Sequence, residues 1–430
     1  MNIALKTPIA IVGLGLSGES AYKFLLASGY KKSDLILFDE KSPKAEVSDP
    51  DILFSKYHPQ TLVVSPGVPL SKPWIQAAKS RGVKITSELN LAASIIKDEI
   101  IIGITGSVGK STTTALIGDA LSKIDKDTFV GGNLGTAFCD YALGIVEESR
   151  ARAKWIVLEL SSYQLENCED IFLDFGVITY FTPNHLERYP SLNDYYNTKL
   201  KIIDFCKGPC ILNQDSTELF SFKSSLEKKY AEKIHWTGAQ NFDIKISLSK
   251  ARLLGEHNQQ NLRLAAVILS KLGLSTEDLQ SLLEYPGLPH RTEYVAEKNG
   301  IHFINDSKAT SIESVLVSVK ACLKNLSTDG RIHLLLGGRD KNLPWQDLDE
   351  LLPYKNILYY FFGESKSLIP QKTNLIGSEF INVESCFKDS LAKAKAGDWI
   401  LFSPGGTSLD QFKNFEERGN FFKSLVIKVD

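Results

Sequence analysis

One glycine-rich stretch of this sequence, residues 100–116 (IIIGITGSVGKSTTTAL), has the residue types and the spacing of a phosphate-binding site. Its apolar start predicts a strand, and its end predicts a helix that begins near Lys110. Between them lies Gly106-x-x-Gly109-Lys110-Ser111. Glycines let backbone N–H groups turn inward around phosphate oxygens, and a helix N-terminus adds partial positive charge. We therefore expect this loop to bind a nucleotide.

Side chains in the same loop would complete the chemistry. Lys110 can reach the terminal phosphates of a nucleotide, and the hydroxyl of Ser111 or Thr112 can bind Mg²⁺. The loop departs from the usual Gly-x4-Gly-Lys-Ser/Thr pattern, because Ile104 stands at its first position. The alternative is a glycine-rich turn with a solvated lysine. The strand before the loop and the helix after it favour nucleotide binding.

Polar residues also follow two further predicted strands. Residues 155–162 (WIVLELSS) contain Glu159, and residues 175–185 (FGVITYFTPNH) end in His185. The carboxyl ends of parallel strands meet at one edge of a sheet, so both side chains should lie near the phosphate loop. Either residue alone would most simply be structural, but their convergence favours work on Mg²⁺ and phosphate. Asn133, in the glycine turn GGNLG, could contact a phosphate or carboxylate oxygen.

The N-terminal stretch predicts a second nucleotide-recognising unit. Residues 8–18 (PIAIVGLGLSG) read as a strand followed by a G-x-G-x-x-G turn, and residues 35–39 (LILFD) read as a strand that ends in Asp39. A Rossmann-like fold places its ribose-binding acid at this spacing. Because no hydride-transfer residues are evident, we expect this unit to hold the nucleotide part of a substrate near Leu16, Ser17 and Asp39.

Two helical patterns further along carry polar residues whose role is open. In DYYNTKLKIID (residues 194–204), Lys199 and Lys201 are by default solvated helix residues, and the pattern does not favour one over the other. In the helical pattern at residues 255–272 (GEHNQQNLRLAAVILSKL), Asn258 and Asn261 could cap the helix. They could equally meet an adenine or a ribose, because residues three apart share one helix face.

Length and the order of these patterns predict three α/β domains. A chain of 430 residues exceeds one ordinary core. A Pro/Gly-rich turn at residues 286–292 (PGLPHRT) indicates a linker, and strands beyond it end in Gly-, Ser-, Asp- or Lys-rich turns that predict another binding edge. We expect a Rossmann-like domain at 1–95, a central P-loop ATPase-like domain with a parallel sheet at 96–290, and a C-terminal Rossmann-like α/β domain at 291–430.

Composition argues against several classes of partner. The 49 basic and 51 acidic residues leave a net charge of −2, and no long basic run suggests nucleic acid or a membrane surface. No apolar stretch approaches the ~20 residues that a membrane span needs. The six cysteines are scattered, and the closest pair, Cys206 and Cys210, lacks further metal ligands nearby in the sequence. We therefore expect free thiols in a reducing cytoplasm. We also expect a monomer.

The ordered motifs of the chain resemble those of the Mur ligases. They are TGSVGKST, GGNLG, LELSSYQLE, NHLERY, the helix with Lys199, HNQQN, PHR, NDSKAT and SPGGTSLDQFKNF. The resemblance runs essentially end to end. It implies an ATP-dependent amide ligase of peptidoglycan precursor synthesis. The first and last domains favour the family member that adds D-glutamate to UDP-N-acetylmuramoyl-L-alanine.

The resemblance also implies a reaction sequence. The carboxylate of the substrate attacks the γ-phosphate of ATP, which gives an acyl phosphate and ADP, and the amine of D-glutamate then displaces phosphate. Such a transfer between anions needs charge neutralisation and alignment. Lys110 would stabilise the γ-phosphate, and Ser111 with Glu159 would hold one Mg²⁺. His185 and a carbamylated Lys199 would hold a second Mg²⁺.

Further roles follow from the same resemblance. The residues it places at catalysis are Lys110, Asn133, His185 and Lys199. Those it places at ATP are Gly106, Gly109, Lys110, Ser111, Thr112, Asn258, Asn261, Arg291 and Asp306. Those it places at the UDP part of the substrate are Leu16, Ser17, Asp39 and Gly67. Those it places at D-glutamate are Thr310, Lys341, Ser408, Leu409 and Phe415.

The sequence departs from the family pattern at a few positions. Val108 stands where the phosphate loop often has Asn, so one contact to phosphate would be absent. Glu40-Lys41 follows Asp39 where the family often has Thr-Arg, which changes the contacts expected around uracil. Gly405-Gly406 stands where small residues such as Ala or Cys are commoner.

Two alternatives compete with this interpretation. One is another ligase of the same fold, either a different Mur ligase or a folylpolyglutamate synthetase-like enzyme; the N-terminal glycine-turn domain suits a UDP-sugar better than a folate. The other is a nucleotide-gated binding protein. Charged residues at several converging strand ends argue for chemistry over a simple switch.

Overall fold

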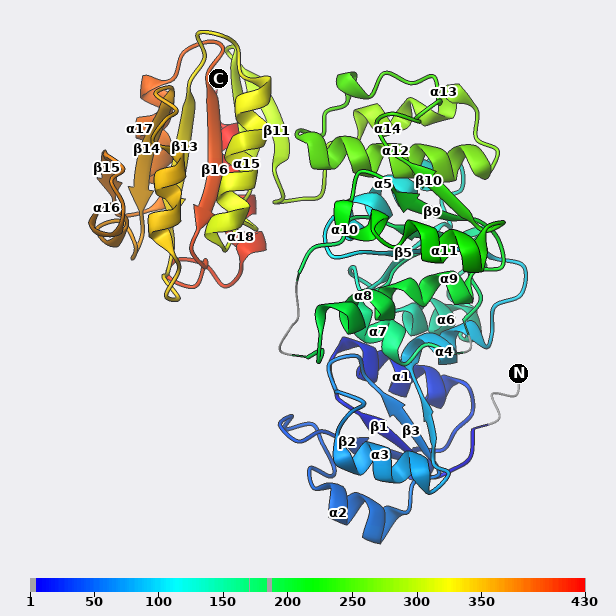
Figure 1. The fold of residues 1–430 in the computed structure, drawn as a ribbon. Helices are drawn as coiled ribbons and strands as arrows, with labels where there is room; N and C mark the ends of the chain where they lie inside the picture. Colours follow the sequence, from blue (N-terminus) through cyan, green and yellow to red (C-terminus); the bar gives the residue numbers. More distant parts are fainter. Residues whose placement is uncertain (1–4, 170, 184–187, 430) are drawn as a thin grey trace. The chain divides into compact units, whose positions relative to one another are not determined.

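The computed structural model of this protein describes residues 5–169, 171–183 and 188–429. Within these residues the strands form three sheets, one of four strands and two of six (Figure 1). The chain gathers into two compact units, residues 1–246 with 260–279 and residues 247–259 with 280–430. The first two sheets belong to the first unit and the third sheet to the second unit. The α/β class and the three sheets agree with the prediction; the domain boundaries at 95/96 and 290/291 stay predictions.

The first sheet is parallel throughout, as a Rossmann-like unit requires. Its strands, in spatial order, are β2 (Leu35–Phe38), β1 (Ile9–Val12), β3 (Thr61–Val64) and β4 (Lys84–Thr86). Successive residues of β1 face opposite sides, so Ile9 and Ile11 pack in the core with α1 (Leu16–Ala27), whereas Ala10 and Val12 pack with α3 (Pro73–Ser80). Burial on both faces explains why β1 is a continuous apolar run.

The second sheet is also parallel throughout. Its strands, in spatial order, are β10 (Ile234–Thr237), β9 (Cys210–Asn213), β8 (Phe175–Ile178), β5 (Ile100–Thr105), β7 (Trp155–Glu159) and β6 (Phe129–Gly132). β5 lies between β7 and β8, so the loop that follows β5 opens beside the ends of both neighbours. The helix after this loop, α5 (Lys110–Ser122), begins at the predicted residue.

The third sheet is mixed, which the sequence analysis did not predict. Its strands, in spatial order, are β11 (Glu293–Lys298), β12 (Ile301–Asn305), β16 (Trp399–Gly405), β13 (Ile332–Gly337), β14 (Ile357–Phe362) and β15 (Gly377–Phe380). β11 pairs antiparallel with β12 through a turn in which Asn299 and Gly300 both have positive φ. Asn-Gly is the preferred pair for such a hairpin turn, so this dipeptide is the signal in the sequence that indicates the antiparallel pair. β11 and β15 are the two edge strands of this sheet.

Helices cover both faces of the third sheet (Figure 1). One buried cluster joins the sheet to α15 (Ile312–Asn325) and to a 3₁₀ helix at Trp345–Leu351. The opposite cluster joins it to α17 (Val383–Lys393) and α18 (Phe415–Ile427). The carboxyl ends of the parallel strands remain available for polar loops.

The remaining helices are mostly short. They are α2 (Pro50–Ile52), α4 (Glu88–Ala93), α6 (Phe138–Val146), α7 (Ser162–Glu166), α8 (Leu192–Leu200), α9 (Ile202–Phe205), α10 (Thr217–Phe220), α11 (Lys223–Tyr230), α12 (Glu256–Lys271), α13 (Thr276–Leu279), α14 (Ser281–Glu284) and α16 (Leu368–Lys372). None of the described helices combines the length and the hydropathy needed to cross a bilayer.

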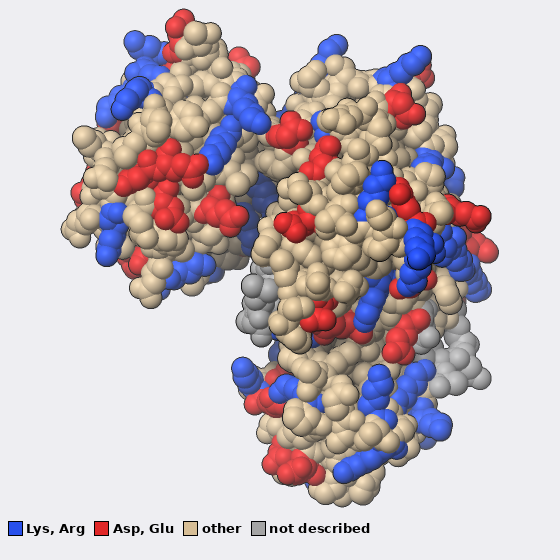
Figure 2. Space-filling model, in the orientation of Figure 1, with Lys and Arg blue, Asp and Glu red and all other residues tan. Residues whose placement is uncertain are grey.

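Charges of both signs alternate over the side of the molecule drawn in Figure 2. Many of them pair, as Lys72 does with Glu40 and Arg263 with Asp215. The six cysteines are buried, and none of them forms a disulfide. The surface in that view therefore carries no extended field of a single sign.

Candidate active site

The predicted phosphate loop connects β5 to α5 and requires glycine at two positions. Gly106 has a φ of +147°, and a Cβ there would lie 2.0 Å from Oγ1 of Thr179. Gly109 has a φ of +86°, and a Cβ there would lie 2.4 Å from Oδ1 of Asn261. Neither the backbone conformation nor the space tolerates a side chain at these positions. The sequence-predicted glycines therefore shape the loop.

Two lysines converge on the carbonyl oxygen of Gly106. Nζ of Lys110 donates to the carbonyl oxygens of Gly106 and Ser107, each at 2.9 Å. Nζ of Lys199, on α8, donates to the same Gly106 oxygen at 2.8 Å. Lys199 is only 1% exposed, and its Nζ also lies 4.7 Å from the ring centre of Tyr195. Two amine groups thus meet at the start of the phosphate loop.

The environment of Lys199 favours the neutral amine. Burial lowers the pKa of Lys199 well below its ordinary value, and the nearby charge of Lys110 lowers it further, while Glu159 acts in the opposite direction. A neutral amine is nucleophilic, which an ammonium group is not. Lys199 therefore has the chemical character of a reactive lysine.

The default interpretation of Lys199 as a solvated helix residue is wrong. Lys201 is exposed, whereas Lys199 is buried. Tyr196, Lys199 and Ile203 recur at the spacing of one helix face, and Tyr196 and Ile203 are both buried. This apolar periodicity carries Lys199 inward, and it is the signal in the sequence that separates Lys199 from Lys201.

Glu159 ends β7 beside the loop and is 2% exposed. Its Oε1 accepts a hydrogen bond from Nδ2 of Asn133 at 2.7 Å, and its backbone oxygen accepts one from the backbone N–H of Asn133 at 2.8 Å. Its Oε2 is buried and has no hydrogen-bond partner among the described residues. A buried carboxylate oxygen without a donor is suited to a cation.

The donor set at this edge fits Mg²⁺. Glu159 offers a carboxylate oxygen, and Ser111 and Thr112 offer hydroxyls from the first turn of α5, where both side chains are partly exposed. Mg²⁺ prefers oxygen ligands and commonly uses one or two carboxylates with substrate phosphates. In the part of the chain that the structure describes, no three His, Cys, Asp or Glu residues gather as a metal site by themselves. His185, the other predicted metal ligand, lies outside the described residues.

The two asparagines of α12 differ in their contacts. Asn261 is buried, and its Oδ1 accepts a hydrogen bond from Oγ1 of Thr113 at 3.3 Å, on the helix that follows the phosphate loop. Asn258 is also buried, and its Nδ2 donates to the carbonyl oxygen of Leu254 at 2.8 Å within the second unit. The adenine and ribose contacts of both residues stay predictions.

A cavity of about 580 Å³ opens at the carboxyl end of the first sheet. All four residues that the resemblance assigns to the UDP part line it, namely Leu16, Ser17, Asp39 and Gly67. The turn that carries Asn133 and the side of Gln164 complete the wall. The cavity therefore extends from the first glycine turn to Asn133, whose side chain is hydrogen-bonded to Glu159.

The side-chain carboxylate of Asp39 holds the cavity wall together by accepting hydrogen bonds from backbone N–H groups. Its Oδ2 accepts from the N–H of Leu14 at 2.9 Å, and its Oδ1 accepts from the N–H groups of Lys41 and Ser42 at 2.8 and 3.0 Å. Partial burial raises the pKa of Asp39, but these N–H groups lower it by more, so the net shift is downward. Asp39 thus stays ionised and ties the glycine turn to the next loop.

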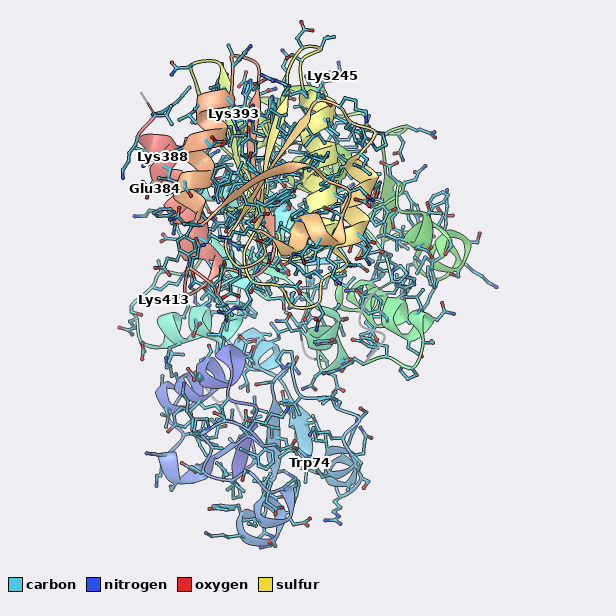
Figure 3. The ribbon with its side chains drawn as sticks, turned by 90° about the vertical axis from the view of Figure 1, so that its left-hand side faces the viewer. Trp74, Lys245, Glu384, Lys388, Lys393 and Lys413 are labelled. Atoms are coloured by element: carbon cyan, nitrogen blue, oxygen red, sulfur yellow. The ribbon has the colours of Figure 1, made fainter. Side chains whose placement is uncertain are left out.

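Trp74 and Lys72 line the cavity without having been predicted from the sequence. Trp74, labelled in Figure 3, lines the wall with its ring centre 5.2 Å from that of Phe38 and 6.2 Å from that of Phe54. Lys72 also lines it and pairs with Glu40 at 2.6 Å. Neither residue belongs to a glycine motif or a strand end, so pattern alone did not indicate it.

In the second unit, Asp306 is engaged from several sides. Its Oδ2 accepts from the hydroxyls of Ser318 and Ser403 at 2.5 and 2.7 Å, and its Oδ1 accepts from the N–H of Thr292 at 2.9 Å. Burial raises the pKa of Asp306 to about 6 against these hydrogen bonds. Arg291, the other predicted ATP residue here, is exposed. Asp306 therefore orders the end of β12, and its contact with ATP stays a prediction.

The five residues predicted to hold D-glutamate all follow strand ends of the third sheet. Ser408 is buried, Thr310 and Phe415 are partly buried, and Lys341 and Leu409 are exposed. They belong to three segments, those after β12, β13 and β16, with Phe415 opening α18. The fold thus places them on loops at the carboxyl edge of one sheet.

Comparison with known proteins gives the family context. Residues 104–269 match the family model described as the Mur ligase middle domain, and residues 7–87 match the model described as Mur ligase MurD-like, N-terminal domain. A UDP-N-acetylmuramoylalanine–D-glutamate ligase of Prochlorococcus marinus is 33% identical, over 97% of this chain and 95% of the relative. A ligase of the same name from Escherichia coli K12 is 32% identical, over 97% of each chain.

Solved structures agree on the fold. MurF ligase from Thermotoga maritima in complex with ADP matches with a TM-score of 0.57 at 17% identity, over 98% of this chain and 95% of that chain. The UDP-N-acetylmuramate–alanine ligase MurC from Thermotoga maritima matches with a TM-score of 0.56 at 16% identity, over 99% of this chain and 100% of that chain.

Proposed function

The chain belongs to the Mur ligase family, and from this premise we propose that it joins D-glutamate to UDP-N-acetylmuramoyl-L-alanine at the expense of ATP, in peptidoglycan precursor synthesis. The observation that carries the proposal is the cluster of Lys110, Lys199, Glu159 and Asn133 beside the phosphate loop. It supplies positive charge and a carboxylate where a triphosphate and an attacking carboxylate would meet. The acceptor amine of D-glutamate would then displace phosphate from the acyl phosphate.

The reaction brings together several anionic groups, so charge neutralisation is the main task of the protein. Lys110 would move from the loop carbonyls to the γ-phosphate. Asn133 would hold Glu159 through its present hydrogen bond or turn to the substrate carboxylate. ATP and Mg²⁺ are the cofactors of the family; Glu159 and Ser111 would hold Mg²⁺, which when bound offsets phosphate charge. His185 would hold a second ion.

We further propose that Lys199 is carbamylated in the working enzyme. Its neutral amine would add to the carbon of CO₂ and lose one proton, which leaves a carbamate with two oxygens. The low pKa of the buried amine supports this addition, and a carboxylate-like oxygen suits a hard cation. The carbamate would also place a negative charge close to the positive charge of Lys110.

The proposed compartment is the cytoplasm, supported by six buried thiols that form no disulfide. We propose that the chain acts as a monomer. Sedimentation at working concentration would give a mass near 47.7 kDa for a monomer and twice that value for a dimer.

The test of the proposed function is release of phosphate from ATP in the presence of UDP-N-acetylmuramoyl-L-alanine, with D-glutamate, L-glutamate, L-lysine or no amino acid. We expect release that depends on D-glutamate together with formation of the amide product. Release that ignores D-glutamate would contradict the proposal. Release that needs no acceptor would favour a nucleotide-gated binding protein, and release that needs another amino acid would favour a different ligase of the family.

The cavity of the first sheet yields a prediction for Trp74, because a uracil ring bound at this wall would lie against it. Replacing Trp74 with alanine should raise the KM for the UDP substrate about tenfold, since base–aromatic stacking contributes about 1–3 kcal/mol. UDP should also change the tryptophan fluorescence of the protein in a saturable way. This change should vanish in Trp74→Phe and persist in Trp236→Phe, because Trp236 does not line the cavity. An unchanged response in Trp74→Phe would remove the base from this wall.

A further inference from the structure

Arg418, on α18, is a fully buried arginine, and no carboxylate among the described residues is hydrogen-bonded to it. Its Nε donates to Oγ of Ser307 at 3.1 Å, and its Nη2 donates to the backbone oxygen of Ser307 at 2.8 Å. Its Nη1 donates to the backbone oxygen of Gly406 at 3.1 Å. The guanidinium fork thus holds two loops that are distant in the sequence, the one after β12 and the one after β16.

Ser307 extends this contact to the start of α18. The Ser307 hydroxyl donates to the backbone oxygen of Phe415 at 2.9 Å while it accepts from Arg418. Arg418 lies one helical turn after Phe415, so the side chain folds back under the N-terminus of its own helix. Lys413, labelled in Figure 3, marks the segment that leads into this helix.

A third loop packs against the same guanidinium. A Cβ on Gly338, which has a φ of +98°, would lie 2.9 Å from Nη1 of Arg418 and 2.4 Å from the backbone oxygen of Thr407. The next residue, Arg339, exchanges two backbone hydrogen bonds with Thr407 at 2.8 and 2.9 Å. The loop after β13, which carries Lys341, is therefore fixed to the loop that carries Ser408.

Burying the charged side chain of Arg418 at this position costs free energy that an apolar side chain would not cost. Burying a charge without a paired counter-charge is unfavourable, and a long apolar side chain could occupy the same volume. Burial lowers the pKa of Arg418 to about 10, with Asp410 and Asp306 opposing the shift from a distance, so the group is still charged at neutral pH. What an apolar residue could not supply is a planar fork that fixes several backbone oxygens at once, with a positive charge.

We propose that Arg418 is the positioning residue for the amino-acid acceptor: it holds the loops after β12, β13 and β16 in register and sets a positive charge beneath them. Thr310, Lys341, Ser408 and Phe415 all sit on segments that this fork contacts directly or through Ser307. This proposal rests on the proposed function, and in it the loops held by Arg418 and the positive charge of Arg418 favour an anionic acceptor. It assigns Arg418 no contact with the substrate.

The test compares Arg418→Lys, which keeps the charge and loses the fork, with Arg418→Met, which loses both. We expect the KM for D-glutamate to rise about tenfold in Arg418→Lys and about a hundredfold in Arg418→Met, because hydrogen bonds from a charged group contribute about 1.5–3 kcal/mol. The KM values for ATP and for the UDP substrate should stay within about twofold of wild type. The matched control is Arg331→Met, because Arg331 pairs with Asp398 at the other end of the same strands, where β13 and β16 begin.

A purely structural role would give a different pattern. It would lower the melting temperature and the active fraction, with an unchanged KM for D-glutamate or with all three KM values raised together, and either result would overturn the proposal. If Arg418→Met does not fold, Arg418→Lys decides on the same criteria. Failure of the proposed function is recognised separately, because the wild-type protein would then release no phosphate in response to D-glutamate.

Discussion

Replacing Lys110 with alanine is expected to abolish measurable turnover. Its Nζ donates to two carbonyl oxygens of the phosphate loop, each at 2.9 Å, and would turn from them to a bound phosphate. Loss of a preorganised charge at a transferring phosphoryl group raises the barrier by about 3–4 kcal/mol, or a few hundredfold in kcat. Phosphate release under saturating substrates measures the effect.

Lys123→Ala is the matched control for this variant, because Lys123 follows the opposite end of α5 and pairs with partly exposed Asp119. Its turnover should equal that of the wild type. Near-normal turnover of Lys110→Ala would contradict the assignment of the loop as the site of phosphoryl transfer.

Replacing Lys199 with alanine should leave the enzyme nearly inactive and open to chemical rescue. The substitution removes a side chain that is 1% exposed and leaves room beside Gly106. Acetate or propionate should partly restore turnover, because a small carboxylate can supply the oxygens that the carbamate would provide. Turnover measured against carboxylate concentration should rise and then saturate.

Lys201→Ala controls for the loss of a lysine from the same segment, since Lys201 is exposed one residue beyond the end of α8. It should retain activity and show no rescue. Full activity of Lys199→Ala without added carboxylate would reduce Lys199 to a structural lysine.

Prediction from the sequence succeeded where local chemistry dictates structure. The strand at Ile100, the glycine loop and the helix start at Lys110 follow from an apolar run, two positive-φ positions and a helix N-terminus, all within a few residues. The parallel sheets followed from the alternation of strands and helices. The convergence of Glu159 and Lys110 followed from the rule that parallel strands end at one edge.

Prediction failed where long-range packing decides. The residue pattern alone did not separate Lys199 from Lys201, because the burial of Lys199 comes from packing against the rest of the core. Nothing local marks Arg418, whose partners Ser307 and Gly406 come from other strands. Trp74 likewise reaches the cavity only through the packing of α3 on the first sheet. Spacing alone predicted Asp39 at this site, but it did not predict the backbone N–H groups of two loops that donate to the Asp39 carboxylate.

The decisive step is transfer of the γ-phosphate to the carboxylate of the UDP substrate, followed by departure of that phosphate with one carboxylate oxygen. UDP-N-acetylmuramoyl-L-alanine labelled with ¹⁸O in the alanine carboxylate, turned over with ATP and D-glutamate, would report it by mass spectrometry of the phosphate. We predict one ¹⁸O in each phosphate released. Unlabelled phosphate alongside normal amide formation would contradict an acyl phosphate formed at Lys110, Lys199 and Glu159.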